Sequence, residues 1–464
     1  MNECIIVLLG ATGDLAKRKI IPALYTLIKL KKLKKFLLVG AAREDVSVQE
    51  MLAPAQKFIN NLDHDVWANL EEHSFYQQVD FHNEKDFDRL SSLISSVEKE
   101  YNLNGNRLAY CGVASDFFCL VTERLCSSGI LHACTQEQKP WNRIVYEKPF
   151  GHNLESAHQI NECTAKLLYE HQIYRVDHYL TKELVSNIAL VRFTNCVFEP
   201  LWNNRYIDQV QIILSEKICL EGRGQYYDKY GAIADVMQNH MLELLALTAM
   251  EMPKWLTGEY IRQERAAVLK NVCAVDVCRG QFEGYTESPG VASNSDSETF
   301  AVAKLMVDNP RWAGVPFYLK TGKCLNKKQT VIHIKFKKIQ CLLTQGCPLV
   351  SNYLTMEIAP EARFYLSLNV KKPRSLYEVV PVDMEFCHDA LTEEKVAESY
   401  EVLLEEVIRG EQSISVRFDE IEYSWKVIDE LNRMDSKLYY YKKGSKGPKE
   451  CEEFEHNHGM RWQS

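Results

Sequence analysis

Length, composition and charge exclude several broad classes of protein. The 464 residues are too many for one compact core, so we expect two domains or one domain with a large second unit. Hydrophobic residues make up 46% of the chain and charged residues 25%, which is ordinary for a globular protein in water. The net charge of -8 argues against general binding of nucleic acids or anionic membranes, although a local basic patch can still hold a small anion.

Neither a targeting signal nor a cysteine cluster in the sequence indicates a more specific class of protein. Residues 4–9 are apolar, but no basic residue precedes them and the run is too short for a signal peptide. No apolar stretch approaches the roughly 20 residues needed to cross a bilayer, so we expect a cytoplasmic protein. The 15 cysteines are scattered without a Cys-x-x-Cys spacing. We therefore expect no metal site and no small disulfide framework, with most cysteines reduced in the core.

The first 45 residues have the pattern of a βαβ unit. Residues 4–9 and 36–41 are short apolar runs typical of buried parallel strands, and a helical pattern joins them to about residue 35. The basic run at residues 29–35 would then end that helix, where lysines suit the dipole. Gly10 and Gly13 lie at the strand-to-helix turn and would let backbone N–H groups approach a pyrophosphate. Leu15 stands where a second P-loop glycine belongs, so the turn predicts a dinucleotide rather than a P-loop site.

The residues after the second strand indicate which dinucleotide is bound. Sites for NAD usually place an acid there for the ribose 2′-hydroxyl, whereas sites for NADP place a cation for the 2′-phosphate. Arg43 is the first charged residue after the strand, and Lys17 and Arg18 follow the glycine turn. NADP is therefore favoured, but Glu44 comes next and leaves some use of NAD open.

Further strands are predicted at residues 107–113, 143–146 and 173–176, with helical patterning in the fifties and nineties. Lys148 follows the second of these strands, at the end where ligands bind in open parallel sheets. The third strand leads into Asp177, His178 and Lys182, and a helical pattern follows over residues 182–192 with Thr181 as a candidate N-cap. A cationic strand-to-helix junction of this kind suits a phosphate. The alternative is a solvated turn.

The chain changes character after about residue 200. Strand patterns follow one another, often without a helix between them, at residues 209–215, 299–307, 316–319, 330–336, 353–358 and 364–370. This succession predicts a large, mainly antiparallel sheet, with helices at residues 234–250 and 390–408. The sequence therefore predicts an α/β dinucleotide-binding domain at residues 1–175 and an α+β domain at residues 176–464. The polar tail from about residue 442 is expected to be loosely held.

The second half also carries candidate site residues. His240 lies within the predicted helix at residues 234–250, where a structural histidine is the plain alternative to a base. Glu216 and Asp235 offer carboxylates for sugar hydroxyl groups, beside a glycine-rich and aromatic loop at residues 221–231. Lys323 and Lys328 add cations to a strand-end loop, unless they are simply solvated.

Taken together, these stretches resemble the glucose-6-phosphate dehydrogenase family in order and over nearly the whole chain. The matching stretches are residues 10–19, 147–151, 175–183, 226–228, 235–240, 311–318, 321–323 and 441–448. The resemblance implies a Rossmann domain and a second domain whose large antiparallel sheet carries dimer contacts, giving a homodimer or a dimer of dimers. It also implies oxidation of glucose 6-phosphate at C1 to the 6-phospho-lactone, the first step of the pentose phosphate pathway, with hydride transfer to NADP.

The same resemblance implies a role for each site residue. His240 would be the general base for the C1 hydroxyl group, and Asp177 the carboxylate that orients it. The sugar phosphate would be held by Lys148, His178, Tyr179, Lys182, Glu216, Asp235, Lys323 and Lys328. The cofactor would be held by Gly10, Thr12, Gly13, Asp14, Leu15, Arg43, Asp80, Phe81 and Lys148, with Lys19 nearby.

Three positions depart from the family pattern. Ser115 stands where a proline is usual, which would leave that cofactor loop less rigid. Thr181 replaces a glycine, and Glu44 would repel the 2′-phosphate. Two rival functions remain open at this point: an oxidoreductase for a different sugar or for NAD, and a dinucleotide-binding regulator without catalysis.

Overall fold

The computed structural model describes residues 3–339, 350–375, 378–387 and 399–463, which form two compact units. The first unit comprises Met1–Thr181, Lys254–Arg262 and Val396–Glu422, and the second comprises Lys182–Pro253, Gln263–Lys395 and Tyr423–Ser464. The first stretch of the first unit ends close to the predicted boundary at residue 175, and two later stretches of the chain return to it. Each unit is built around one sheet.

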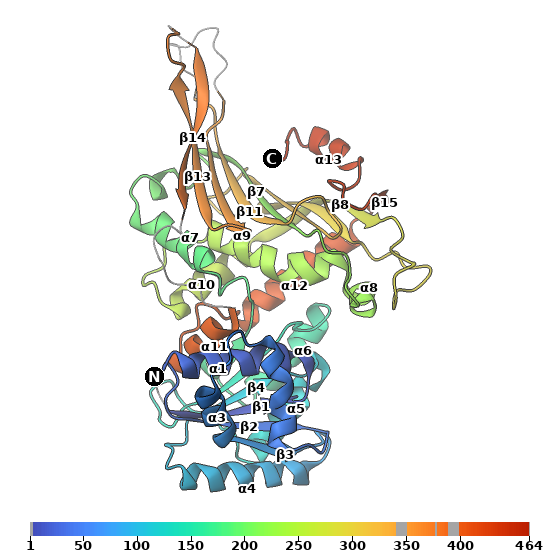
Figure 1. Ribbon diagram of the computed structural model, residues 1–464. Coiled ribbons are helices and arrows are strands. Elements are labelled where there is room, and N and C mark those ends of the chain that lie inside the picture. Colours follow the sequence, from blue (N-terminus) through green and yellow to red (C-terminus); the bar gives the residue numbers. More distant parts are fainter. Residues whose placement is uncertain (1–2, 340–349, 376–377, 388–398, 464) are drawn as a thin grey trace. The chain divides into compact units, whose positions relative to one another are not determined.

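The first unit is a six-stranded parallel sheet with strand order β3-β2-β1-β4-β5-β6 (Figure 1). The strands are β1 (Cys4–Leu9), β2 (Phe36–Ala42), β3 (Ser74–Gln78), β4 (Arg107–Cys111), β5 (Asn142–Tyr146) and β6 (Ile173–Arg175). Every residue of β1 and β2 is buried, as expected for continuous apolar runs in a parallel sheet covered on both faces. The predicted parallel sheet is confirmed, and the polar strand β3 was not predicted.

The helices of this unit lie on both faces of the sheet (Figure 1). They are η1 (Ala16–Ile20), α1 (Ile21–Lys29), α2 (Val48–Leu52), η2 (Ala53–Phe58), α3 (His64–Glu72), α4 (Glu84–Glu100), η3 (Ser115–Phe117), α5 (Phe118–Ser127), α6 (Leu154–Ala165), η4 (Glu170–Gln172) and α11 (Ser399–Arg409). The helix expected to reach residue 35 ends at Lys29, because the chain reverses with Lys31 at a positive φ of 56°. Most of the basic run is therefore loop. The helix predicted from residue 390 is observed from Ser399, and its first residues lie outside the described ones.

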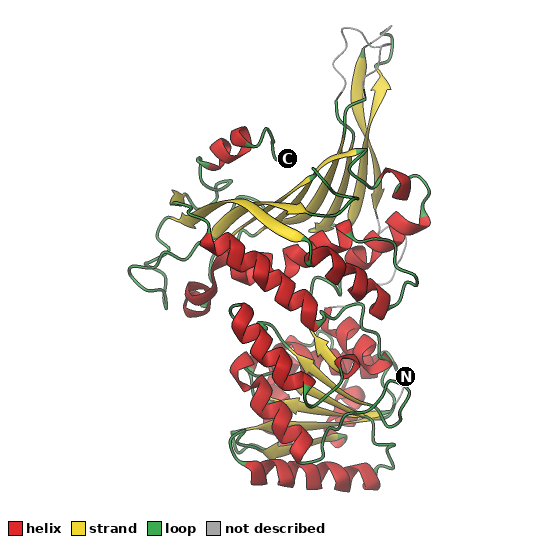
Figure 2. Ribbon diagram, turned by 180° about the vertical axis from the view of Figure 1, so that it is seen from behind, coloured by secondary structure: helices red, strands yellow, loops and turns green. Residues whose placement is uncertain are grey.

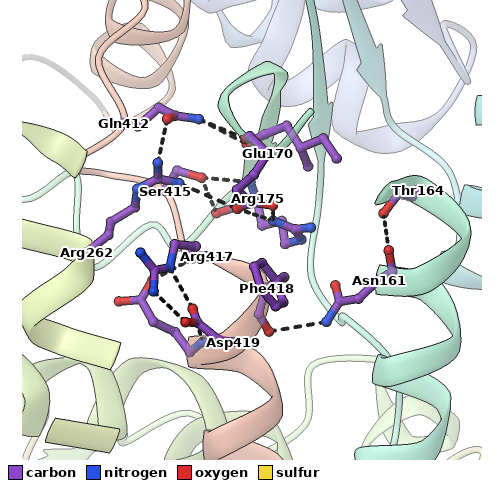
Figure 3. Close-up of polar contacts among 12 residues, drawn as sticks. Asn161, Thr164, Glu170, Arg175, Arg262, Gln412, Ser415, Arg417, Phe418 and Asp419 are labelled. Carbon is purple, nitrogen blue, oxygen red and sulfur yellow. Dashed lines mark hydrogen bonds and ion pairs between the residues drawn. The ribbon is translucent and has the colours of Figure 1, made fainter. Parts of the chain in front are cut away.

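A returning segment of the chain, residues 410–419, closes the outer edge of β6 (Figure 3). The backbone N–H of Arg175 donates to Ser415 Oγ at 3.0 Å, and the N–H of Val416 donates to the Arg175 carbonyl at 3.0 Å. The buried Arg175 guanidinium donates to both carboxylate oxygens of Glu170, at 2.8 and 3.0 Å. These contacts satisfy an otherwise open strand edge and fix the strand that leads into Asp177.

The second unit contains a nine-stranded sheet with strand order β14-β13-β12-β11-β7-β10-β9-β8-β15. Its strands are drawn in yellow in Figure 2. The strands are β7 (Ile207–Ser215), β8 (Val272–Phe282), β9 (Phe300–Val307), β10 (Pro316–Gly322), β11 (Gln329–Phe336), β12 (Tyr353–Ala359), β13 (Arg363–Lys371), β14 (Val379–Cys387) and β15 (Leu438–Tyr441). All neighbouring pairs are antiparallel except β7–β10 and β8–β15. The mainly antiparallel sheet is as predicted, although β8, β14 and β15 were missed.

Helices accompany this sheet on both sides (Figure 1). They are α7 (Glu183–Thr194), η5 (Glu199–Leu201), α8 (Gly224–Ala232), η6 (Ile233–Met241), α9 (Leu242–Ala249) and α13 (Cys451–Asn457), while α10 (Gly258–Leu269) and α12 (Phe418–Arg433) span the chain boundaries of the two units. The expectation of a loose tail is wrong. Cys451 and Phe454 of α13 are buried, and Gln211 Nε2 of β7 donates to the Arg461 carbonyl at 2.7 Å.

Candidate active site

The glycine turn after β1 packs tightly against the residues that follow β4. Gly10 has a φ of +79°, and a Cβ at this position would lie 2.5 Å from the carbonyl oxygen of Gly112. The Gly13 N–H donates back to the Gly10 carbonyl at 2.9 Å, and helical structure begins at Asp14 and Leu15. The turn therefore lies at the carboxyl ends of parallel strands and opens a helix, as in dinucleotide sites. Only glycine fits at its first position.

The loop after β2 lies against this turn. Thr12 Oγ1 donates to a carboxylate oxygen of Glu44 at 2.7 Å. This hydrogen bond is the main cause that lowers the pKa of Glu44, and the nearby charges of Arg43 and Lys17 act in the same direction. The Tyr76 hydroxyl donates to the Glu44 carbonyl at 2.5 Å, which fixes the loop. Arg43 and Glu44 thus place a cation and a carboxylate side by side, at the position where proteins of this fold recognise the 2′ group of the ribose.

The remaining residues predicted for the cofactor lie along the same edge. Asp80 and Phe81 follow β3, the strand beside β2. The Asp80 carboxylate accepts from the N–H of His82 at 3.0 Å, and the ring of Phe81 lies 5.9 Å from that of Phe117. Lys148 follows β5 and is half-buried. The first unit therefore gathers the predicted cofactor residues at one end of its sheet.

The stretch after β6 forms a tight turn on the first unit. Asp177 is buried and accepts from the N–H of Tyr179 at 2.8 Å, while the N–H of Leu180 donates to its carbonyl at 3.0 Å. The sequence predicted Thr181 as the N-cap of α7, but Lys182 occupies that position. The Thr181 hydroxyl instead donates to the His178 carbonyl at 3.0 Å. The turn holds Asp177 through its own backbone and leaves His178 and Tyr179 half-buried beside it.

Glu147, to which the sequence analysis assigned no role, contacts His178. The two side chains approach at 3.3 Å between Oε2 and Nε2, and the Tyr110 hydroxyl donates to Glu147 Oε1 at 2.5 Å. The ring of Tyr400, in α11, lies 4.4 Å from the imidazole. Glu147 could have been found by its place in the family stretch directly before Lys148, but Tyr400 is more than 200 residues away in the sequence.

In the second unit, Asp235 and His240 share the wide helix η6. Its i→i+5 hydrogen bonding brings residues five apart, such as these two, about one turn from each other. Both residues are buried. The Tyr226 hydroxyl donates to Asp235 Oδ1 at 3.3 Å, and burial followed by the Asp235 charge raises the pKa of Tyr226. A π-helical segment is costly and often marks a functional position.

Glu216 and Lys323 are joined by an ion pair. They follow β7 and β10, which are parallel neighbours with Ser215 opposite Gly322, so both side chains come from the same sheet edge. The Lys323 ammonium group is buried and also lies 5.3 Å from the centre of the Tyr227 ring. Lys328 lies just before β11 and is exposed. Two of the predicted substrate residues are therefore brought together directly.

A disulfide links the two loops that carry this ion pair. Cys219 and Cys324 are bonded, with their Cα atoms 4.7 Å apart and a separation of 105 residues. The sequence analysis did not single out this pair, although most of the described cysteines are free, as expected. Parallel neighbours bring together loops that are far apart in the sequence, and sequence spacing does not reveal such a pairing.

These features define a class. A parallel sheet with a glycine turn fitted to a dinucleotide, followed by a unit that places carboxylate, imidazole and ammonium groups along one sheet edge and helix, is typical of a dinucleotide-dependent oxidoreductase acting on a hydroxylated substrate. Within the described residues, no helix is both long enough and apolar enough to cross a membrane.

Comparisons with known proteins identify the family. Residues 7–187 match the model of the glucose-6-phosphate dehydrogenase NAD binding domain, and residues 189–463 match that of the C-terminal domain. The chain is 37% identical to glucose-6-phosphate 1-dehydrogenase of Chlamydia pneumoniae, over 99% of this chain and 96% of that one. It is 35% identical to that of Bacillus subtilis, over 99% and 98% of the two chains. The chain belongs to the glucose-6-phosphate dehydrogenase family.

Solved structures agree with this membership. A glucose-6-phosphate dehydrogenase in complex with its substrate glucose-6-phosphate superposes with a TM-score of 0.90 at 29% identity, covering 100% of this chain and 99% of that one. The glucose-6-phosphate 1-dehydrogenase of Mycobacterium avium gives a TM-score of 0.88 at 30% identity, over 99% and 98%. The predicted fold class and the assignment as an oxidoreductase are thereby confirmed.

Proposed function

We propose that this chain oxidises D-glucose 6-phosphate at C1 to 6-phospho-D-glucono-1,5-lactone with NADP as cofactor, the first step of the pentose phosphate pathway. The observation that carries the proposal is the match of both family models, which together span residues 7–187 and 189–463. The motif residues predicted for catalysis and phosphate binding are all present within that span.

The glycine turn supports the cofactor part of the proposal. Gly10 packs against the Gly112 carbonyl with no room for a Cβ, and this close packing fixes the strand-to-helix turn at the carboxyl end of the sheet, where a pyrophosphate binds in such folds. Gly10, Thr12 and Gly13 would hold the pyrophosphate, and Arg43 would hold the 2′-phosphate. When bound, NADP supplies the acceptor for the hydride from C1.

His240 is the proposed general base, and it would take the proton from the C1 hydroxyl group. Asp177 would orient the imidazole and stabilise its protonated form, which is the usual work of a carboxylate beside a catalytic histidine. Both residues are buried, and the buried state strengthens the effect of a charge on its partner. Removal of the proton from the C1 hydroxyl oxygen assists departure of the hydride from C1.

The phosphate would be bound by His178, Tyr179 and Lys182, with Lys323 and Lys328 as further cations. Glu216 and Asp235 would accept hydrogen bonds from sugar hydroxyl groups, and Lys148 would lie between sugar and cofactor. The ion pair of Glu216 with Lys323 supports their joint use, because each side chain fixes the other before substrate binds.

A panel of substrates tests this function. Initial rates with glucose 6-phosphate, galactose 6-phosphate and glucose, each with NADP and with NAD, should show the highest kcat/KM for glucose 6-phosphate with NADP. A preference for an unphosphorylated sugar, or for another sugar phosphate, would overturn the substrate assignment. No reduction of either cofactor with any sugar would support the rival of a regulator without catalysis.

We also infer a homodimer, or a dimer of dimers, in the cytoplasm. The edge strand β14 exposes Val382, Met384 and Phe386 on one of its faces, and an exposed apolar patch of this kind is typical of a surface that another chain covers. The mass in solution, measured by light scattering, should equal two or four chains. A monomer at micromolar concentration would contradict the inference.

A further inference from the structure

Glu147 is the centre of a four-residue cluster within the first unit. It follows β5 directly, and its partners come from three other places in the chain: Tyr110 in β4, His178 after β6 and Tyr400 in α11. Tyr110 donates a hydrogen bond to one carboxylate oxygen at 2.5 Å, and His178 Nε2 lies 3.3 Å from the other. Tyr400 also forms a hydrogen bond with the carboxylate. One carboxylate thus links three elements at the ligand-binding edge of the sheet.

Burial makes these contacts necessary. The Glu147 side chain is only 12% exposed, and a buried carboxylate is costly unless hydrogen bonds replace its water. Burial first, and the Glu147 charge second, raise the pKa of both Tyr110 and Tyr400, so both hydroxyl groups stay protonated and able to donate. The cluster therefore keeps its donors over the whole physiological pH range.

The consequence falls on the imidazole of His178. Its Nε2 edge is held by Glu147, and its face lies against the Tyr400 ring at 4.4 Å between centroids and 41° between planes. Among the residues that the structure describes, no hydrogen-bond partner reaches its Nδ1. Because a carboxylate only accepts, Nε2 must carry the proton that points at Glu147. Nδ1 can then donate to a phosphate oxygen only in the doubly protonated imidazolium, in which both ring nitrogens are donors.

We infer that Glu147 is a positioning residue for the phosphate group of the substrate, acting through the imidazole of His178, with Tyr110 and Tyr400 fixing the carboxylate. This inference rests on the proposed function, which assigns the phosphate to His178. A side chain held in its binding orientation before the ligand arrives loses less freedom on binding, so the effect should appear in affinity for phosphate rather than in the chemical step.

Three variants with steady-state kinetics test the inference. Glu147→Ala should raise the KM for glucose 6-phosphate, and the Ki of inorganic phosphate as its competitor, by about tenfold or more, while kcat and the KM for NADP change less than about threefold. Tyr400→Phe should shift the same two constants in the same direction by a smaller factor. Glu147→Gln, which keeps one acceptor oxygen, should fall between Glu147→Ala and the unchanged chain.

Glu98→Gln is the matched control. Glu98 is 13% exposed, lies in the same unit and pairs with Arg107, which begins β4 at the end of the sheet opposite the glycine turn, so its loss should leave the Ki of phosphate unchanged. Equal Ki values for phosphate in Glu147→Ala, Tyr400→Phe and the unchanged chain would overturn the inference. A fall in kcat with both phosphate constants unchanged would overturn it too. If the unchanged chain does not oxidise glucose 6-phosphate at all, the proposed function fails instead. If Glu147→Ala does not fold, Tyr400→Phe and Glu147→Gln decide the question.

Discussion

The hydroxyl of Thr12 donates a 2.7 Å hydrogen bond to the carboxylate of Glu44, joining the glycine turn after β1 to the loop after β2. This contact holds a negative charge next to Arg43, the residue proposed for the 2′-phosphate of NADP. The chain thus combines the cation typical of NADP sites with the acid typical of NAD sites.

Glu44→Gln should therefore sharpen the preference for NADP. Glutamine can still accept the hydrogen bond from Thr12, so the substitution removes charge and little else. Removing a like charge near the 2′-phosphate should raise the ratio of kcat/KM for NADP over NAD by roughly three- to tenfold. Asp45→Asn, one residue further along the loop, is the control and should have a smaller effect. A ratio that stays constant or falls in Glu44→Gln would show that Glu44 does not act on cofactor choice.

Gly10→Ala should disrupt the cofactor turn. The added Cβ would lie 2.5 Å from the Gly112 carbonyl and would also require a φ of +79°. Gly129→Ala separates these two effects, because Gly129 has a φ of +72° with nothing within 4 Å of the added atom. Strain alone should cost about 1–2 kcal/mol of unfolding free energy in both variants. Only Gly10→Ala should also raise the KM for NADP, by tenfold or more, and equal KM values in the two variants would contradict the role of the turn.

Lys182→Ala should weaken binding of the sugar phosphate before it affects turnover. A charged hydrogen bond to phosphate contributes roughly 1.5–3 kcal/mol, so the KM for glucose 6-phosphate should rise about 10- to 100-fold. The KM for NADP should not change. Lys371→Ala, which removes an exposed lysine of β13, serves as the control. An unchanged KM for glucose 6-phosphate in Lys182→Ala would remove Lys182 from the phosphate site.

His333 should make the second unit sensitive to acid. Burial, with a smaller contribution from the Lys327 charge, lowers the pKa of His333 from 6.5 to about 4. The folded chain therefore holds this imidazole neutral, whereas the unfolded chain takes up a proton below pH 6.5. The resulting stabilisation is present above pH 6.5 and is lost as the pH falls toward 4, by about 3 kcal/mol in total.

His333→Gln checks this pH dependence. Glutamine is neutral at every pH and can still bond to Thr355 Oγ1, the partner that His333 Nδ1 meets at 2.8 Å. Urea unfolding at pH 7 and at pH 4.5 should show a loss of unfolding free energy that is smaller in His333→Gln than in the unchanged chain by about 2–3 kcal/mol. Equal losses in the two proteins would mean that His333 is not the titrating group.

The strands with a clear local pattern of apolar residues could be predicted from the sequence. The apolar runs at residues 4–9 and 36–41 became fully buried strands, because a parallel sheet buries both faces of its strands. The strand patterns predicted in the second half of the chain correspond to the central strands of one sheet. The polar strand β3 was missed because it has no apolar run, and β15 because it has only four residues.

Features that depend on contacts between distant parts of the chain could not be predicted from the sequence. Residues 399–422 return to the first unit and bring Tyr400 to Glu147, and no local sequence pattern around either residue predicts that contact. The pairing of Cys219 with Cys324 and the ion pair of Glu216 with Lys323 likewise follow from β7 and β10 being parallel neighbours. The roles of His240 and Asp177 come from the family stretches and remain predictions.

The most direct test of the proposed mechanism is the rate of NADPH formation from glucose 6-phosphate by His240→Ala and by the unchanged chain, both at saturating substrate. A general base typically contributes roughly 10²–10⁴ in rate, so kcat should fall by that factor while the KM for glucose 6-phosphate changes little. A fall in kcat of less than about tenfold would contradict the assignment of His240 as the base.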